Sequence, residues 1–337
     1  MKYTLTIFIY CILLGTRLYA QDPVLSQAYT AAQFLSPASV GAGMYEHRVQ
    51  GNLRSQFMNG NSMYKTNVVG WDTRFKNKSV QGSNNFLAMG LQLMSDQLGG
   101  GLLNTTYLTV NTAYHMSLDK ENKSNLSVGM GGTLAQTYIN KDKLRFGDQF
   151  DGMGNFNGSI VSADYSNLRP SPLKFAGNIG VLYAYHSEES FFQIAANAFY
   201  YGRPDNVSTG INQAGGVRTG FFTNIEKYLT EDYTFILHGS YNNRNNLQQT
   251  LVGGSIGIPF LYRSENVNRI YAGCFVRIGD AIIPTLSLMM DKYTFGISYD
   301  VYSNALSRAN LRLNGFELSF STGFGKKRAN VFRTLLN

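Results

Sequence analysis

The chain is poor in charge, proline and cysteine, and its interior has no long apolar run. Lys, Arg, Asp and Glu make up 15% of the 337 residues, against about 25% in typical soluble proteins. After the first twenty residues no apolar stretch reaches the roughly 18 residues that a membrane-spanning helix needs. A polytopic helical membrane protein is therefore excluded. The two cysteines are too few for a disulfide framework.

Aromatic residues and glycine, by contrast, are abundant. The chain has 22 Tyr, 22 Phe and 35 Gly, and 44% of its residues are hydrophobic. This apolar content excludes a disordered protein. A chain with few charges, many Tyr, Phe and Gly and no hydrophobic block is typical of a secreted all-β protein or of an outer-membrane β-barrel.

The first twenty residues have the features of a secretory signal peptide. Lys2 supplies a positive start, residues 5–14 form an apolar core of suitable length, and Leu18-Tyr19-Ala20 is a plausible cleavage site. We expect export and removal of residues 1–20. The remaining chain carries 27 basic and 21 acidic residues, a net charge of +6. Cys274 is then its single cysteine, so the fold cannot depend on an internal disulfide.

Side-chain type alternates with a period of two along most of the remaining chain, which predicts β-strands. One face of each segment is large and apolar, and the other is Gly, Ser, Asn and Thr with few charges. Because a soluble sandwich would carry Lys and Glu on its outer face, the pattern favours a barrel whose apolar face meets lipid. The segment at 216–227 is also compatible with a helical turn near its end. The fourteen predicted strands are 45–57, 63–76, 85–98, 102–117, 124–139, 173–186, 191–201, 216–227, 232–243, 247–260, 268–278, 280–290, 293–302 and 313–324.

Connection lengths agree with this even number of strands. If both ends of the barrel chain are periplasmic, connections after odd-numbered strands face outward and are the longer ones. The two longest, 140–172 and 202–215, follow the fifth and seventh strands. We therefore predict an antiparallel outer-membrane barrel over residues 45–324, a pre-barrel segment over 21–44 and a basic periplasmic tail over 325–337.

Charged residues on the polar face predict contacts at the seam where the barrel closes. In lipid every backbone hydrogen-bonding group must be paired internally, so the first and last strands have to meet. An arginine in this setting can hold a carboxylate through two hydrogen bonds. Separate solvated charges in the lumen are the alternative. The residues that we place at the seam or in the lumen beside it are Arg48, Arg54, Asp72, Asp300 and Glu317.

Three stretches of the chain carry recognisable motifs. The mature chain opens with Gln21-Asp-Pro-Val-Leu-Ser-Gln-Ala-Tyr, followed by Phe34-Leu-Ser-Pro-Ala-Ser-Val-Gly. The first predicted strand contains Asn52-Leu-Arg-Ser-Gln-Phe, and the last two contain Phe295-Gly-Ile-Ser-Tyr-Asp and Gly315-Phe-Glu-Leu-Ser-Phe. In this order they resemble the opening motif, the first strand and the closing pattern of the PorP/SprF family of Bacteroidota outer-membrane proteins of type IX secretion. The matches lie at both ends of the mature chain.

The resemblance implies a non-enzymatic protein that helps to secrete cargo or to hold it at the cell surface. Its implied partners are type IX components, large adhesins such as those of gliding motility, the C-terminal domains of secreted cargo, periplasmic ring lipoproteins and outer-membrane lipid. No cofactor and no nucleic acid are expected. The alternative function is a passive porin for small solutes, because a fourteen-strand barrel can enclose an aqueous lumen.

Two regions are the candidate contact sites. The connection 140–172 is long for a segment without periodicity, which is typical of a functional loop, and its cargo-contact candidates are Asp148, Phe150, Asp151 and Phe156. Its oxygen donors also suggest Ca²⁺, although their spacing does not follow an EF-hand. For periplasmic docking the candidates are Asp22, Phe34, Lys326, Lys327 and Arg328. The alternatives are that residues 21–44 plug the lumen and that the basic tail is a solvated end.

Overall fold

The computed structural model describes residues 23–59, 61–76, 85–151, 153–166, 173–201, 216–229, 233–244, 247–262, 267–303 and 314–327. The predicted signal peptide, Asp22, the connection 202–215, Arg328 and the rest of the tail lie outside the described residues. Within them, no helix is long and apolar enough to cross a membrane.

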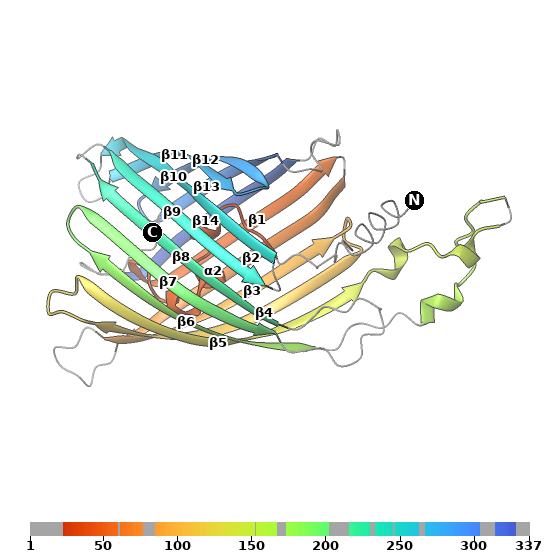
Figure 1. The fold of residues 1–337 in the computed structure, drawn as a ribbon, viewed down its shortest axis with the longest axis horizontal. Coiled ribbons are helices and arrows are strands. Elements are labelled where there is room, and N and C mark those ends of the chain that lie inside the picture. The colour runs from red at the N-terminus through yellow and green to blue at the C-terminus, as the bar shows by residue number, and fades with distance from the viewer. Residues whose placement is uncertain are drawn as a thin grey trace, which may run out of the picture.

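The described residues form a closed antiparallel barrel (Figure 1). Each strand pairs with the next along the chain, and β1 pairs with β14 to close the cylinder. The predicted barrel and its fourteen strands are confirmed, and the eighth strand is extended rather than a helical turn. The strands are β1 Tyr45–Asn59, β2 Asn61–Lys76, β3 Phe86–Leu98, β4 Leu103–Ser117, β5 Ser124–Ile139, β6 Lys174–His186, β7 Ser190–Tyr201, β8 Gly216–Tyr228, β9 Thr234–Arg244, β10 Leu247–Tyr262, β11 Val267–Arg277, β12 Ala281–Met290, β13 Tyr293–Tyr302 and β14 Asn314–Lys327.

The two faces of the sheet differ as the alternation predicts. On β3, Leu87, Leu91 and Leu93 point outward and are exposed, while Ala88 and Gln92 between them are buried inside. Because a closed sheet leaves no unpaired edge, its backbone groups are satisfied within the barrel and the apolar outer face can sit in lipid.

The interior is more apolar than the sequence pattern suggests. On β9 to β12, large side chains point inward and are almost fully buried, including Ile236, Tyr271, Phe275 and Ile283. The expectation of a lumen lined only by small and polar residues is therefore wrong for this side of the barrel. These side chains can point inward because another segment of the chain lies inside the lumen and packs against them.

We call the end where odd-numbered strands finish the outer end, and the opposite end the periplasmic end. Long connections mark the extracellular side of such barrels, and the connection between β5 and β6 lies at the outer end. Its described residues include three short 3-10 helices, η3 Lys141–Lys143, η4 Gly147–Gln149 and η5 Ala163–Ser166. Figure 1 shows this connection projecting beyond the ends of the strands.

Candidate functional site

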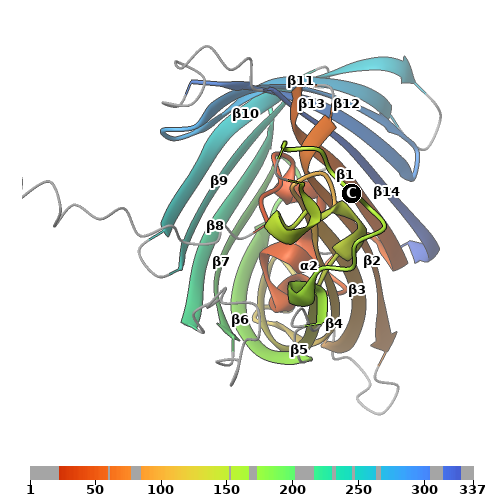
Figure 2. The ribbon, with the colours of Figure 1, turned by 90° about the vertical axis from the view of Figure 1, so that its right-hand side faces the viewer.

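Residues 23–44, which we call the plug segment, occupy the interior of the barrel (Figure 2). The segment contains the 3-10 helix η1 Ala28–Thr30, the short helix α2 Ala32–Leu35 and the 3-10 helix η2 Pro37–Ser39. Between Leu25 and Ala42 nearly every residue is buried. Its many alanines allow a compact path, and lumen side chains take up several of the backbone groups that a buried irregular segment would otherwise leave unpaired.

The plug segment runs from the outer end of the lumen to the periplasmic end. Ser26 contacts Asp300 near the end of β13 and Arg277 at the end of β11. Further along, the carbonyl of Val40 contacts His115 near the end of β4. The chain then enters β1 at Tyr45, whose register partner is Lys327 of β14.

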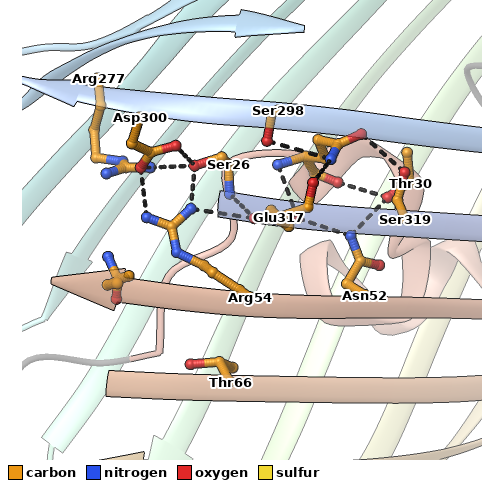
Figure 3. A network of polar contacts seen from close by, with 12 residues as sticks. Ser26, Thr30, Asn52, Arg54, Thr66, Arg277, Ser298, Asp300, Glu317 and Ser319 are labelled. Atoms are coloured by element: carbon orange, nitrogen blue, oxygen red, sulfur yellow. Dashed lines mark hydrogen bonds and ion pairs between the residues drawn. The ribbon is translucent and has the colours of Figure 1, made fainter. Parts of the chain in front are cut away.

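A buried cluster of charges holds the outer part of the plug segment (Figure 3). Arg54 on β1 lies 2.6 Å from Asp300 and 3.1 Å from Glu317, and the side chains of all three are at most 1% exposed. Arg277 adds a second cation, 2.9 Å from Asp300. Ser26 lies between them and hydrogen-bonds with Arg54, Arg277 and Asp300. Arg277 also pairs with Asp280 at 2.7 Å, whose side chain is 32% exposed, so two cations contact two buried carboxylates and a third at the edge of the site.

Glu317 is the point where this cluster contacts the plug backbone. Its carboxylate accepts hydrogen bonds from the amides of Ser26, at 2.6 Å, and Gln27, at 3.1 Å. The Asn52 side chain donates to the same carboxylate and also to Thr30 of the plug segment. Hydrogen bonds to charged groups contribute about 1.5–3 kcal/mol each, so this carboxylate is a strong anchor for the plug segment.

A second ion pair holds the periplasmic part of the plug segment. Arg48 and Asp72 are direct register partners on β1 and β2, and their side chains lie 2.7 Å apart. Asp72 also accepts from the amide of Gly41, and Arg48 donates to the carbonyl of Ser39. The ion pair therefore hydrogen-bonds with both an N–H donor and a C=O acceptor of the plug backbone.

Neighbouring side chains complete this periplasmic attachment. Arg74 donates to the carbonyls of Gly43 and Met44, at 3.0 and 2.9 Å. The His115 Nε2 donates to the Val40 carbonyl at 2.7 Å, and its ring stacks on Phe86. Backbone groups of the plug segment are thus paired by side chains of the barrel wall, the pairing that buried polar groups require.

All five residues predicted at the seam face the lumen and take part in these two clusters. Arg54 and Glu317 are direct partners across the β1–β14 seam, whereas Asp300 reaches the cluster from β13. The sequence reasoning missed Arg277, Arg74 and Ser26. The available signal was that Arg277 shares the inward-facing positions of its strand and that Ser26 lies within the opening motif.

Close fit between wall and plug predicts a sensitive position on β5. A Cβ atom added to Gly129 would lie 2.4 Å from the Ala38 nitrogen, a backbone atom that cannot turn aside. We expect Gly129→Val to displace η2 from the wall and to make the plug segment cleavable by added protease in the purified protein. Gly177→Val on neighbouring β6 is the control, because nothing lies within 4 Å of its added Cβ. Equal protease resistance of both variants would contradict the observed packing.

The predicted cargo-contact residues lie together in the connection beyond β5. Phe150 and Phe156 form an isolated antiparallel bridge, and their ring centroids are 5.6 Å apart. Asp148 and Asp151 accept hydrogen bonds from backbone amides of this connection. The Asn155 side chain and nearby backbone amides lower the pKa of Asp151 by hydrogen bonding to its carboxylate. These hydrogen bonds therefore stabilise the turn at pH values above the usual carboxylate pKa, and the stabilisation is lost as pH falls through the lowered pKa of Asp151.

The predicted docking residues are placed differently from one another. Phe34 lies inside the lumen, where its ring is 5.6 Å from the Arg218 guanidinium, and so it does not present a periplasmic surface. Lys326 and Lys327 are exposed at the periplasmic end, but they are the last residues of β14 rather than part of a separate tail. The strand continues because Tyr45 of β1 pairs with Lys327.

No site for metal or catalysis stands out among the described residues. No group of three or more His, Cys, Asp or Glu in the described ranges could hold a metal ion. Gly253-Gly-Ser-Ile-Gly257 matches the G-x-S-x-G sequence of a hydrolase nucleophile elbow, a motif that depends on a strand-to-helix turn. Here these residues lie within strand β10.

A family model for the type IX secretion system membrane protein PorP/SprF matches residues 18–321. The chain belongs to the PorP/SprF family. The match runs from before the plug segment to β14 and so includes both charge clusters. Family membership and the closed barrel place this PorP/SprF protein in the outer membrane as a secretion-related barrel, and they imply interaction with type IX components. No curated protein sequence matches the chain.

Several solved outer-membrane proteins are similar to this PorP/SprF barrel in outline. The toluene transporters TbuX of Ralstonia pickettii and TodX of P. putida are each 8% identical to it, with 88% of this chain and 94% of theirs covered and TM-scores of 0.45 and 0.46. The KdgM porin is 9% identical, with 82% of this chain and 99% of the porin covered and a TM-score of 0.37.

Proposed function

We propose that this PorP/SprF protein is a non-enzymatic barrel that assists secretion or cell-surface attachment of cargo, such as large adhesins, through protein–protein contacts. The observation that carries the proposal is the filled lumen. The plug segment is anchored by buried ion pairs toward both ends, and apolar side chains of β9 to β12 fill the space beside it. A barrel filled in this way has its surfaces, rather than a channel, available for function.

The outer connection is the contact surface that we assign to cargo. Phe150 and Phe156 remain 40% exposed although they pair with each other, and Met153 at the intervening turn is 91% exposed. Exposed aromatic and methionine side chains in one place are typical of protein interfaces. The connection projects beyond the barrel mouth (Figure 1), where a protein outside the cell can reach it.

At the periplasmic end, Lys326 and Lys327 provide an exposed pair of cations. We assign them to contact with a periplasmic ring lipoprotein of the secretion system. Such contacts between exposed charges mainly steer association and weaken as salt is added.

Co-purification from the outer membrane tests the cargo contact. We expect an adhesin C-terminal domain to be recovered with the wild-type protein, and recovery to fall about tenfold or more in a Phe150→Ser/Phe156→Ser variant, because central aromatic anchors dominate such interfaces. Leu118→Ser is the matched control, since Leu118 is an exposed apolar residue at the periplasmic end. Equal recovery of the adhesin domain with all three proteins would contradict the role of the outer connection in cargo contact. Recovery with none of the three would contradict cargo binding by this protein.

A further inference from the structure

Phe57, near the outer end of β1, does not follow the alternation of its strand. Arg54 and Gln56 contact Tyr302 inside the barrel, and Leu53 is 54% exposed on the lipid face. The two-residue alternation therefore places Phe57 on the lipid face. Instead, its ring is half-buried and packs against the buried apolar cluster that includes Tyr302.

The backbone of Phe57 adopts an unusual conformation in this position. Its φ is +58°, in the left-handed region that a bulky side chain rarely allows. The other described non-glycine residues with positive φ, Asn122 and Asp291, lie in turns between strands, whereas β1 pairs with β2 on both sides of Phe57. Backbone strain of this kind persists only where surrounding contacts maintain it, and it is concentrated at sites with a conformational or functional role.

Two tyrosines hold the Phe57 ring over the lumen. Its centroid lies 5.2 Å from that of Tyr64, in an edge-to-face arrangement, and 5.3 Å from that of Tyr302. Aromatic pairs at these distances are favourable. The Tyr302 hydroxyl accepts a hydrogen bond from Arg54 at 3.4 Å. The Phe57 ring therefore lies beside a residue that contacts the charge cluster around Ser26.

The lipid face is also suited to this side chain. Aromatic residues form girdles near both membrane interfaces of such barrels, and an extended backbone at residue 57 is free of strain. The ring contacts with Tyr64 and Tyr302 favour the inward position, and the backbone favours the outward one. A residue balanced in this way has two discrete conformations, and a small change in its contacts can shift the population between them.

We propose that Phe57 is a lid on the outer mouth of the lumen, and that its outward turn admits water to the charge cluster and loosens the outer part of the plug segment. With the ring inward, the side chains of Arg54, Asp300 and Glu317 are at most 1% exposed. Their attraction depends on this exclusion of water, because a higher local dielectric constant weakens ion pairs. The periplasmic attachment of the plug segment lies at the other end of the lumen, away from the lid.

Tryptophan fluorescence tests the two positions of the lid. The chain has a single tryptophan, Trp71, so Phe57→Trp in a Trp71→Phe background is a reporter at position 57 alone. In bilayers that contain brominated lipid, we expect this reporter to be quenched only weakly. Leu53→Trp in the same background is the matched control on the lipid face of the strand, and it should be quenched strongly. Adding Tyr64→Ala removes a contact that holds the lid and should raise quenching at position 57 to the level of this control.

Hydrogen exchange in the full-length protein measures the consequence for the plug segment. The amides of Ser26 and Gln27 are hydrogen-bonded at the outer end of the lumen, and the amide of Gly41 at the periplasmic end. We expect Phe57→Ala to speed exchange at Ser26 and Gln27 about tenfold or more, because the local opening that exposes them becomes easier. Exchange at Gly41 should stay as in the wild type. Leu53→Ala, which shortens an exposed side chain of the same strand, should leave all three amides unchanged.

Three results would overturn the proposal. The first is quenching at position 57 that equals quenching at position 53 before Tyr64 is changed. The second is a reporter at position 57 that stays unquenched after Tyr64→Ala, and the third is exchange in Phe57→Ala no faster than in Leu53→Ala. Faster exchange at Gly41 as well would mark a variant that does not fold correctly. Tyr64→Leu, which keeps an apolar side chain without the ring, and Phe57→Leu then replace the two alanine variants. No cargo is present in these measurements, so their outcome is independent of the co-purification result.

Discussion

Replacing Arg54 by Met is expected to lower the free energy of unfolding by about 3–5 kcal/mol, because the substitution leaves buried carboxylates without their shared cation. Arg54 lies within 3.1 Å of both Asp300 and Glu317 and is 1% exposed. Asp300 keeps its contact with Arg277 in the variant, although Arg277 is shared with Asp280. Glu317 keeps only neutral donors, so the largest cost falls on the group that anchors Ser26 and Gln27. Urea titration of the protein refolded into micelles measures the loss.

Two variants make this result specific. Lys123→Gln breaks an exposed pair with Glu121 at the periplasmic end, and should leave the free energy of unfolding nearly unchanged, because solvent screens exposed ion pairs. Adding Glu317→Gln to Arg54→Met should recover part of the stability, because the uncompensated charge is then absent. If Arg54→Met costs no more than Lys123→Gln, the cluster does not hold the barrel and plug together.

Deleting residues 23–44 is expected to convert a closed barrel into a conducting one. In planar bilayers the wild-type protein should show no steady single-channel current, because the plug segment and the side chains around it fill the lumen. Without the segment, polar wall residues such as Gln50, Asn52 and Asn111 would line a hydrated path between β1 and β6. Steady current steps in the deletion variant are the expected outcome.

A deletion of residues 147–162 is the matched control for this experiment. That stretch belongs to the outer connection, which projects beyond the strands (Figure 1), so its loss should leave the lumen closed. Steady current through the wild-type protein would favour the porin alternative over the proposed function. A plug deletion that remains closed would show that the apolar side chains of β9 to β12 close the lumen without the plug.

Much of the barrel wall could be predicted from residue order. The strands at 124–139 and 293–302 match the structure at both ends, because inward and outward side chains alternate by local strand geometry. The inward orientation of Arg48 and Arg54 follows from the same two-residue alternation. The closing pair of strands follows from the requirement that a barrel in lipid has no open edge.

The path of the plug segment could not be read in this way. Its Pro, Ser and Ala residues have no period that indicates which wall residues they contact. Ser26 and Asp300, which hydrogen-bond at 2.6 Å, are 274 positions apart. Phe34 shows the same limit, because an apolar residue before the first strand is compatible with a docking surface or with a lumen, and only its place beside Arg218 and the buried cluster decides between them.

The placement of the few charged residues is therefore explained partly by the order of residues and partly by the tertiary structure. Residue order alone established that charges avoid the lipid face and collect on the polar face of the strands, since that division repeats every second residue. Tertiary structure decided which of them meet. Arg54, Arg277, Asp300 and Glu317 come from four strands and form one cluster around Ser26 only because the barrel closes and the plug segment passes through it. Barrel closure and the passage of the plug segment through the lumen bring together residues that are far apart in the sequence. No local sequence pattern therefore identifies which residues come into contact.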